Sequence, residues 1–163
     1  VSVAAMAREL RIGRDGFDDS VFGGAIGVAG KHQLSVDDDL RWQVNFGNGL
    51  GRYLGLNAFN VGAINADGEI ELTPQFGVFA AYRHRWNDRF HSSIGVSIAE
   101  ADNDTAIGGF DVPKSYQSAH ANFVWIPINR MSIGAEYIWG RREDESGADG
   151  VLNRLQLSAK YLY

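Results

Sequence analysis

The sequence predicts an all-β protein, an antiparallel transmembrane β-barrel with about eight strands in this chain. Two observations predict this fold class. Polar and apolar residues alternate with a period of two along the 163 residues, and the i, i+3, i+4 spacing of an amphipathic helix is nowhere sustained. The predicted strands are also long: strands of globular proteins average about 5 to 6 residues, whereas a tilted strand needs about 9 to 11 residues to cross a bilayer.

Clusters of turn-forming residues divide the chain into eight predicted strands. In chain order these strands are residues 1–12, 20–33, 39–47, 73–86, 89–101, 115–126, 131–142 and 151–163. The three prolines, Pro74, Pro113 and Pro127, lie at strand edges or in connections, because proline cannot donate a hydrogen bond to a β-ladder. No linker or low-complexity tract interrupts the pattern, so we expect residues 1–163 to form a single β-barrel domain or part of a larger barrel.

The connections between these strands are predicted to alternate in length. Residues 34–38, 86–90 and 127–130 form short turns, whereas the connections on the other side are long, polar and rich in Gly, Asp and Asn. The predicted long connections are residues 13–19, 47–72, 102–114 and 142–150. Short periplasmic turns that alternate with longer external loops are typical of bacterial outer-membrane barrels.

Each predicted strand has one apolar and one polar face. In residues 39–47 the apolar side chains are Leu40, Trp42, Val44 and Phe46, and the polar ones are Arg41, Gln43 and Asn45. Alternation alone does not decide which face points outward, because a soluble barrel has its apolar face inside and a membrane barrel has it outside. A soluble ligand-binding barrel therefore stays an alternative at this point.

Aromatic residues favour the membrane alternative. They gather near the two ends of the predicted strands, with smaller aliphatic residues between them. Those near the short turns are Trp42, Trp86, Phe90, Trp125, Tyr161 and Tyr163, and those near the long connections are Phe22, Phe46, Phe76 and Trp139. Amphipathic rings prefer the two membrane–water interfaces, so two aromatic girdles have a physical cause in a bilayer. The bland alternative is that aromatic residues simply suit β-strands.

Basic residues concentrate inside the predicted strands, whereas acidic residues occupy turns and loops. Among the 20 acidic residues only Glu9 and Glu136 lie well inside a strand. The polar faces predict a positively charged lumen, and a low-dielectric wall focuses such a field on passing anions. The candidate lumen residues are Arg11, Lys31, Arg41, Arg83, Arg85, Arg154 and Lys160. Alternatively, any one of these cations only holds a loop or snorkels at a membrane edge.

Arg8 does not fit this set. It has the same parity as Leu10 and Ile12, so we expect it to face lipid or a neighbouring chain unless a bulge shifts the register.

Other function classes find little support in the sequence. A net charge of -5 argues against nucleic acid as a partner. The four histidines, His32, His84, His91 and His120, lack metal-ligand spacing, and no catalytic or phosphate-binding motif occurs. We therefore expect no catalytic residue, metal or cofactor, and no enzyme. An outer-membrane hydrolase that uses His91 or His120, with Ser93 or Ser118 on the same polar faces, stays an alternative.

Several phrases of the sequence resemble one known family. Residues 38–53 (DDLRWQVNFGNGLGRY), 81–84 (AYRH) and 99–103 (AEADN) resemble the DcaP-type porins of Gram-negative bacteria, and residues 136–143 with 152–161 look like the closing hairpin of that family. The resemblance covers essentially the whole chain. It implies a trimeric porin in the bacterial outer membrane, in contact with the lipid bilayer and lipopolysaccharide, which admits small anionic solutes such as dicarboxylates.

Two departures from the family pattern are visible. The last residue is Tyr163, where the family usually has phenylalanine. Family members are also roughly twice as long, so the chain resembles their C-terminal part only, and constriction residues that lie upstream cannot be carried over.

The strand count matters for function. Eight strands closed on themselves leave an interior that side chains fill, whereas open channels need about 16 strands. We therefore expect a segment of a larger porin barrel. The alternatives are a pair of such chains, or a small closed eight-stranded barrel with a structural or adhesion role and no channel.

Overall fold

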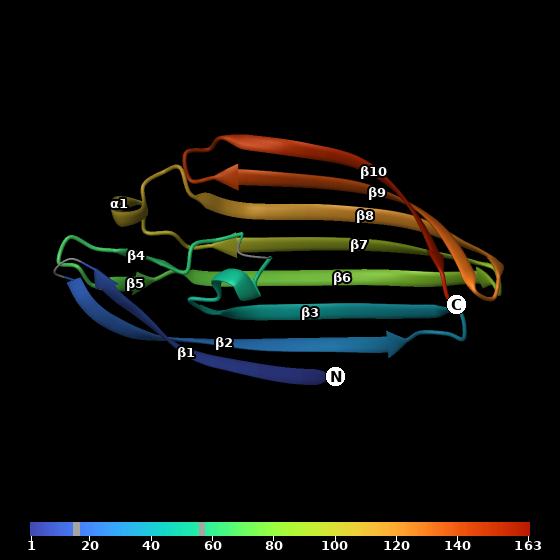
Figure 1. Ribbon diagram of the computed structural model, residues 1–163, viewed down its shortest axis with the longest axis horizontal. Coiled ribbons are helices and arrows are strands. Elements are labelled where there is room, and N and C mark those ends of the chain that lie inside the picture. The colour runs from blue at the N-terminus through green and yellow to red at the C-terminus, as the bar shows by residue number, and fades with distance from the viewer. Residues whose placement is uncertain (15–16, 56–57) are drawn as a thin grey trace.

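The computed structural model describes residues 1–14, 17–55 and 58–163 of the chain. Within these residues the fold is an antiparallel β-structure of ten strands, eight of which form one sheet (Figure 1). The strands of this sheet, in spatial order, are β1 (Ser2–Arg14), β2 (Phe17–Gln33), β3 (Asp38–Asn48), β6 (Pro74–Asn87), β7 (Phe90–Ala101), β8 (Pro113–Ile128), β9 (Met131–Asp144) and β10 (Asp149–Tyr161). The all-β antiparallel prediction is confirmed.

All eight predicted strands are present, with ends shifted by a few residues. Two further strands, β4 (Gly62–Ile64) and β5 (Ile70–Leu72), pair with each other inside the predicted connection 47–72 and were not predicted. The eight-stranded sheet is open: its order runs from β1 to β10, and no pairing joins these two strands within the described residues. The sheet is therefore an arc, and barrel closure is not seen in this chain.

The strict alternation of short turns and long loops was wrong. The long connections are residues 49–73 and 102–112. Of the long connections expected at 13–19 and 142–150, residues 13–14, 17–19, 142–144 and 149–150 belong to strands, and residues 15–16 lie outside the described residues. Side-chain ion pairs extend these hairpins: Arg11 contacts Asp18, and Arg141 contacts Asp149 at 3.1 Å. Polar residues that read as loop in the sequence are thus cross-strand partners at the ends of long hairpins.

Within the residues that the structure describes, the long connections contain two short helices. The 3₁₀ turn η1 (Gly51–Tyr53) is in the first connection, and α1 (Thr105–Gly108) is in the second. Asp104 caps α1 by accepting a hydrogen bond at 2.8 Å from the backbone N–H of Ala106. No helix in the described part of the chain is long and apolar enough to cross a membrane.

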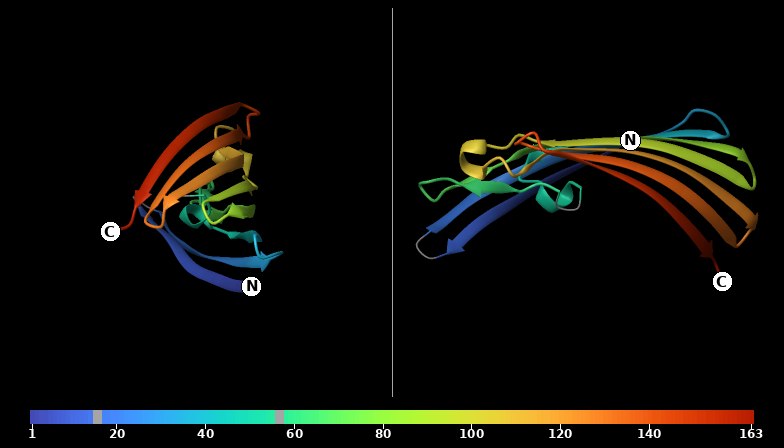
Figure 2. Two further views of the ribbon diagram at one scale, coloured as in Figure 1. Left: turned by 90° about the vertical axis from the view of Figure 1, so that its right-hand side faces the viewer. Right: turned by 90° about the horizontal axis from the view of Figure 1, so that it is seen from above.

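The sheet is strongly curved, and the connection 49–73 lies on its concave side (Figure 2). Side chains directly opposite each other in a β-ladder share a face, so the register assigns every strand residue to one side. Lys31 pairs with Arg41, and Asp39 pairs with Arg83, on the concave side. The neighbouring residues Leu40 and Trp42 belong to the convex side.

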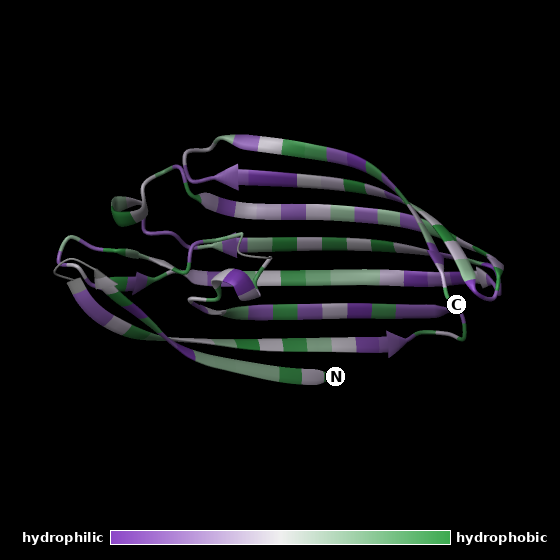
Figure 3. Ribbon diagram, in the orientation of Figure 1, coloured by the Kyte–Doolittle hydropathy of each residue, from purple (hydrophilic) through white to green (hydrophobic). Residues whose placement is uncertain are grey.

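The convex face is mostly apolar, and many of its large apolar side chains are exposed. Phe22 is 75% exposed, Leu155 is 72% exposed and Leu157 is 76% exposed. The alternating bands along the strands show the same division (Figure 3). Soluble monomers rarely expose a contiguous apolar surface larger than a few hundred Å². The convex face therefore has the character of a surface that contacts lipid.

Buried apolar residues are few, and they mark where the connection packs on the sheet. Within the described residues the buried hydrophobic side chains are Ala25, Leu50, Leu54, Phe59 and Ala101. Three of these five come from the connection 49–73 and two from the concave face. The core of this chain is thus the contact between one loop and the inside of the arc.

Candidate functional site: the concave face and its loop

The connection 49–73, here called the inner loop, is fixed on the concave face by polar contacts at its start. Gln75 is 4% exposed, and its side chain accepts a hydrogen bond from the backbone N–H of Gly51 at 3.0 Å and donates one to the carbonyl of Asn60 at 2.5 Å. Gly51 has a φ of 48°, and a Cβ atom there would clash with Val61 Cγ1. The loop therefore closes on itself at a position that only glycine fits.

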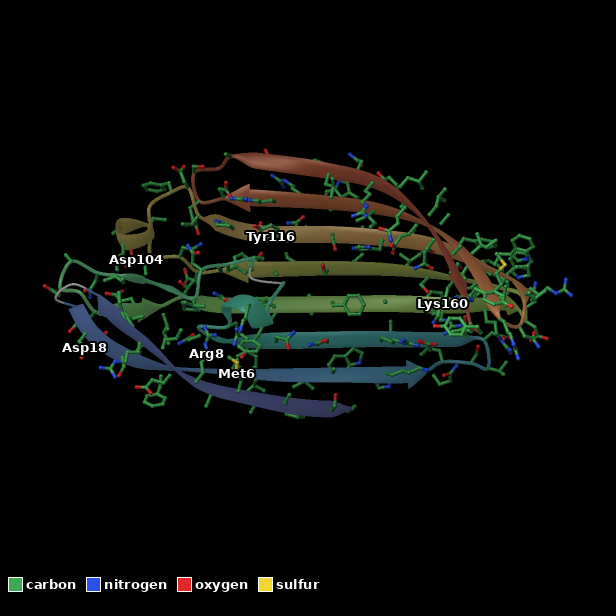
Figure 4. The ribbon with its side chains drawn as sticks, viewed as in Figure 1. Met6, Arg8, Asp18, Asp104, Tyr116 and Lys160 are labelled. Atoms are coloured by element: carbon green, nitrogen blue, oxygen red, sulfur yellow. The ribbon has the colours of Figure 1, made fainter. Side chains whose placement is uncertain are left out.

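Aromatic contacts hold the inner loop at two sides of the arc. Phe59, which is 2% exposed, packs edge-to-face on Tyr116 of β8 with ring centroids 5.3 Å apart. On the other side, the guanidinium of Arg8 in β1 lies 5.6 Å from the ring centroid of Tyr53. Arg8 and Tyr116 lie on either side of the inner loop (Figure 4). A loop anchored at both sides narrows the space inside the arc.

The loop turn carries positive charge. Arg52 lies 5.3 Å from the centroid of the Tyr53 ring and donates a hydrogen bond of 3.3 Å to its hydroxyl group. This hydrogen bond, together with the charges of Arg52 and Arg8, lowers the pKa of Tyr53. The turn is therefore a site of positive potential, and sequence reasoning did not include Arg52 or Tyr53 among the candidates.

Arg8 lies on the concave face, so the expectation that it faces lipid was wrong. It pairs with Gly23 in an unbroken register, and the glycine leaves room for the inner loop above it. Its Nε and Nη2 atoms are buried and have no hydrogen-bond partner among the described residues. Residues Met6 and Leu10 share this face with Arg8, so this side of β1 meets the inner loop.

Arg11 consequently lies on the convex face, unlike the other six candidate cations. It pairs with Ser20 of β2, and the next residue of that strand, Val21, points to the concave side. Ser20 and Arg11 therefore point to the convex side. Its guanidinium binds the carboxylate of Asp18 through Nε and Nη2 at 2.9 to 3.0 Å. Arg11 stabilises a hairpin and contributes no charge to the concave face.

Three of the candidate cations gather around one buried acid on the concave face. Asp39 is 7% exposed, and its carboxylate lies 2.9 Å from Arg41 Nε and 3.8 Å from Lys31 Nζ. Arg83 is the cross-strand partner of Asp39. Three cations and one anion leave this cluster with net positive charge near the short-turn end of the arc.

The remaining candidates differ in how far their charge is neutralised. Arg85 contacts two turn residues, Asp37 at 2.8 Å and Asp88 at 3.4 Å, so it is largely compensated. Arg154 and Lys160 are exposed on the concave side of β10, opposite Ile138 and Ser132, and form no ion pair within the described residues. Lys160 lies toward the short-turn end (Figure 4).

The polar residues behind the hydrolase alternative are partly brought together. His120 Nε2 lies 3.2 Å from Ser118 Oγ, and His120 Nδ1 lies 3.5 Å from Glu136 Oε1. Ser118 also shares a hydrogen bond of 2.8 Å with Ser97. His91 and Ser93 lie further along the concave face, beside Arg83 and Arg85. No group of metal-ligating side chains is found in the described ranges.

An antiparallel sheet with a mostly apolar convex face, a largely polar concave face and an inward loop is the arrangement of a protein that crosses a membrane with β-strands. The comparisons with known proteins agree. The family model of the DcaP outer membrane protein matches residues 1–163, and the chain belongs to this family. Its place is the bacterial outer membrane.

One solved structure shows the same fold. The crystal structure of the outer membrane channel DcaP of Acinetobacter baumannii matches with a TM-score of 0.83 at 21% sequence identity. The match covers 98% of this chain and 46% of that one, so the chain spans less than half the length of the channel it resembles. No curated protein matches the sequence.

Proposed function

We propose that this chain forms part of an outer-membrane porin through which small, anionic solutes diffuse passively. The observation that carries the proposal is the distribution of charge on the arc. Lys31, Arg41, Arg83, Arg154 and Lys160 share the concave face, whereas the convex face is apolar. Cations on a wall of low dielectric constant focus their field into the adjoining water and raise the local concentration of anions.

The pore itself is proposed to be completed by additional strands. The free edges of β1 and β10 leave backbone hydrogen-bonding groups unpaired, which is not tolerated in the hydrocarbon region of a bilayer. Eight strands closed on themselves would leave no open channel. The match to the DcaP channel covers only 46% of that channel's chain, which supports a larger barrel. The family resemblance supports a trimer of such barrels.

The experiment is a measurement of ion selectivity in planar bilayers with the full-length polypeptide. In a salt gradient the wild-type reversal potential is expected to show preference for anions. Arg83→Glu is expected to shift the reversal potential toward cation preference, because it removes a cation beside Asp39 and adds an anion. Arg85→Glu is expected to shift it less, since Asp37 and Asp88 already compensate this charge.

Arg11→Glu is the matched control, because it reverses the same charge on the convex face. A reversal potential that responds equally to Arg83→Glu and Arg11→Glu, or to neither, contradicts a basic lumen. Absence of any ion conductance would instead favour a closed barrel with a structural or adhesion role.

A further inference from the structure

The concave face contains a recess with a mostly apolar lining. It has a volume of about 700 Å³ and lies between the inner loop and strands β7 to β10. Its lining includes the apolar residues Ala58, Ala99, Tyr116, Ile138 and Leu152, together with Arg141 and Arg142. Pockets that hold small molecules in proteins measure about 300 to 1,000 Å³ and are mostly apolar with a few polar groups. The recess has both properties.

The apolar lining is unusual for its position in the sheet. Ile138 and Leu152 stand on the concave side, in the same rows as Glu136, Arg154 and Gln156. Leu152 is 56% exposed there. A large aliphatic side chain on the water-facing side gains nothing from lipid, so a solute that covers it from the lumen would remove apolar surface from water.

Polar groups lie on two sides of this apolar surface, on β7 and β8 and on β10. Ser97 and Ser118 line the recess and share a hydrogen bond of 2.8 Å. Arg154 follows Leu152 on the same face of β10, about 7 Å along the strand, and stands opposite Ile138. Arg154 forms no ion pair with the residues that the structure describes.

The other charged groups near the recess are already engaged. Arg142 donates to Asp144 at 2.7 Å, and Arg141 lies 3.1 Å from both Glu143 and Asp149. The carboxylate of Glu136 lies 3.5 Å from His120. The cation that remains for a ligand is Arg154, which stands next to the recess, opposite its lining residue Ile138.

We infer that this recess binds an organic anion with a single carboxylate and an apolar body, such as a medium-chain aliphatic acid. The inference deepens the proposed function and rests on it. The apolar body covers Tyr116, Ile138 and Leu152, and the carboxylate pairs with Arg154, which follows Leu152 on the same face of β10. Such a site selects among anions of equal charge by their apolar surface.

The test compares acetate with hexanoate as blockers of the chloride current through the full-length protein in planar bilayers. Both carry one negative charge, so a basic lumen alone treats them alike. Each buried CH₂ group contributes about 0.8 kcal/mol, so partial burial of the four additional groups lowers the half-blocking concentration of hexanoate at least about tenfold below that of acetate. Calorimetric titration of the detergent-solubilised protein with hexanoate gives a second readout.

Leu152→Ser is expected to reduce the hexanoate-to-acetate ratio to within about threefold, and Arg154→Gln is expected to weaken both blockers. Phe79→Ser is the matched control, because Phe79 is an exposed apolar residue of the concave face outside the recess. A ratio near one in the wild type, or an equal loss in Phe79→Ser and Leu152→Ser, overturns the inference while leaving anion conduction intact. A protein without conductance refutes the proposed function instead.

Discussion

At Gly51 the fold of the inner loop depends on a single residue. The backbone has a φ of 48°, which costs a residue with a side chain roughly 1–2 kcal/mol, and the space of a Cβ atom is occupied by Val61. The same peptide donates its N–H to the buried side chain of Gln75. The glycine at position 51 therefore allows both the tight turn and the hydrogen bond that attaches the loop to Gln75.

Gly51→Ala is therefore expected to make local opening of the inner loop easier by about 1–3 kcal/mol. Amide hydrogen exchange at Tyr53 and Leu54 measures this opening, because both N–H groups donate to carbonyls within the turn. Gly108→Ala serves as the control, since a Cβ atom there meets nothing within 4 Å and the backbone is helical. Exchange that is equally slow in both variants would show that Gly51 does not hold the loop.

The two arginines of β1 show where sequence patterns fail for single residues. The parity of Arg8 and Arg11 was read correctly, but the face was assigned to the wrong side. Both faces of this strand mix apolar and polar residues, so alternation alone does not fix its direction. The decisive contact is with the inner loop, through Tyr53, and a contact with a distant loop leaves no periodic signal in the strand.

At the scale of elements, the inner loop is the part that sequence reasoning described least. The connection was recognised from its glycine and asparagine content, but its η1 turn and the β4–β5 hairpin were not. Short strands of three residues carry too few residues for a period of two to appear. The long strands were predicted to within a few residues, because each offers many alternating positions.

Phe59 is expected to determine whether the inner loop stays inside the arc. Phe59→Ala removes a side chain that is 2% exposed and in edge-to-face contact with Tyr116, which costs about 3–5 kcal/mol in a packed core. In the proposed pore the loop is then released from the concave face, and single-channel conductance rises. Phe110→Ala is the control: Phe110 lies in the connection 102–112 and is 60% exposed, so this change is expected to leave conductance unchanged. Equal conductance in all three proteins would place the loop outside the conducting path.

At the scale of the whole molecule, one curved sheet separates mostly polar side chains on its concave face from mostly apolar side chains on its convex face. Six of the seven candidate cations lie on the concave side. Side chains alternate between the two faces along each long strand, and paired residues of neighbouring strands share a face, so the alternation predicts the side correctly. The apolar recess was not predicted. Leu152 has the parity of Arg154 in its strand, and the register of β9 with β10 places Ile138 on the same side.

The orientation of these two faces is tested most directly by cysteine labelling, because the chain contains no cysteine. Ser118 and Ala119 are neighbours on β8 that point to opposite faces, as do Ser158 and Ala159 on β10. In intact outer membranes a water-soluble maleimide is expected to label Ser118→Cys and Ser158→Cys but not Ala119→Cys or Ala159→Cys. Labelling of the two alanine positions with protection of the two serine positions would contradict a water-filled concave side.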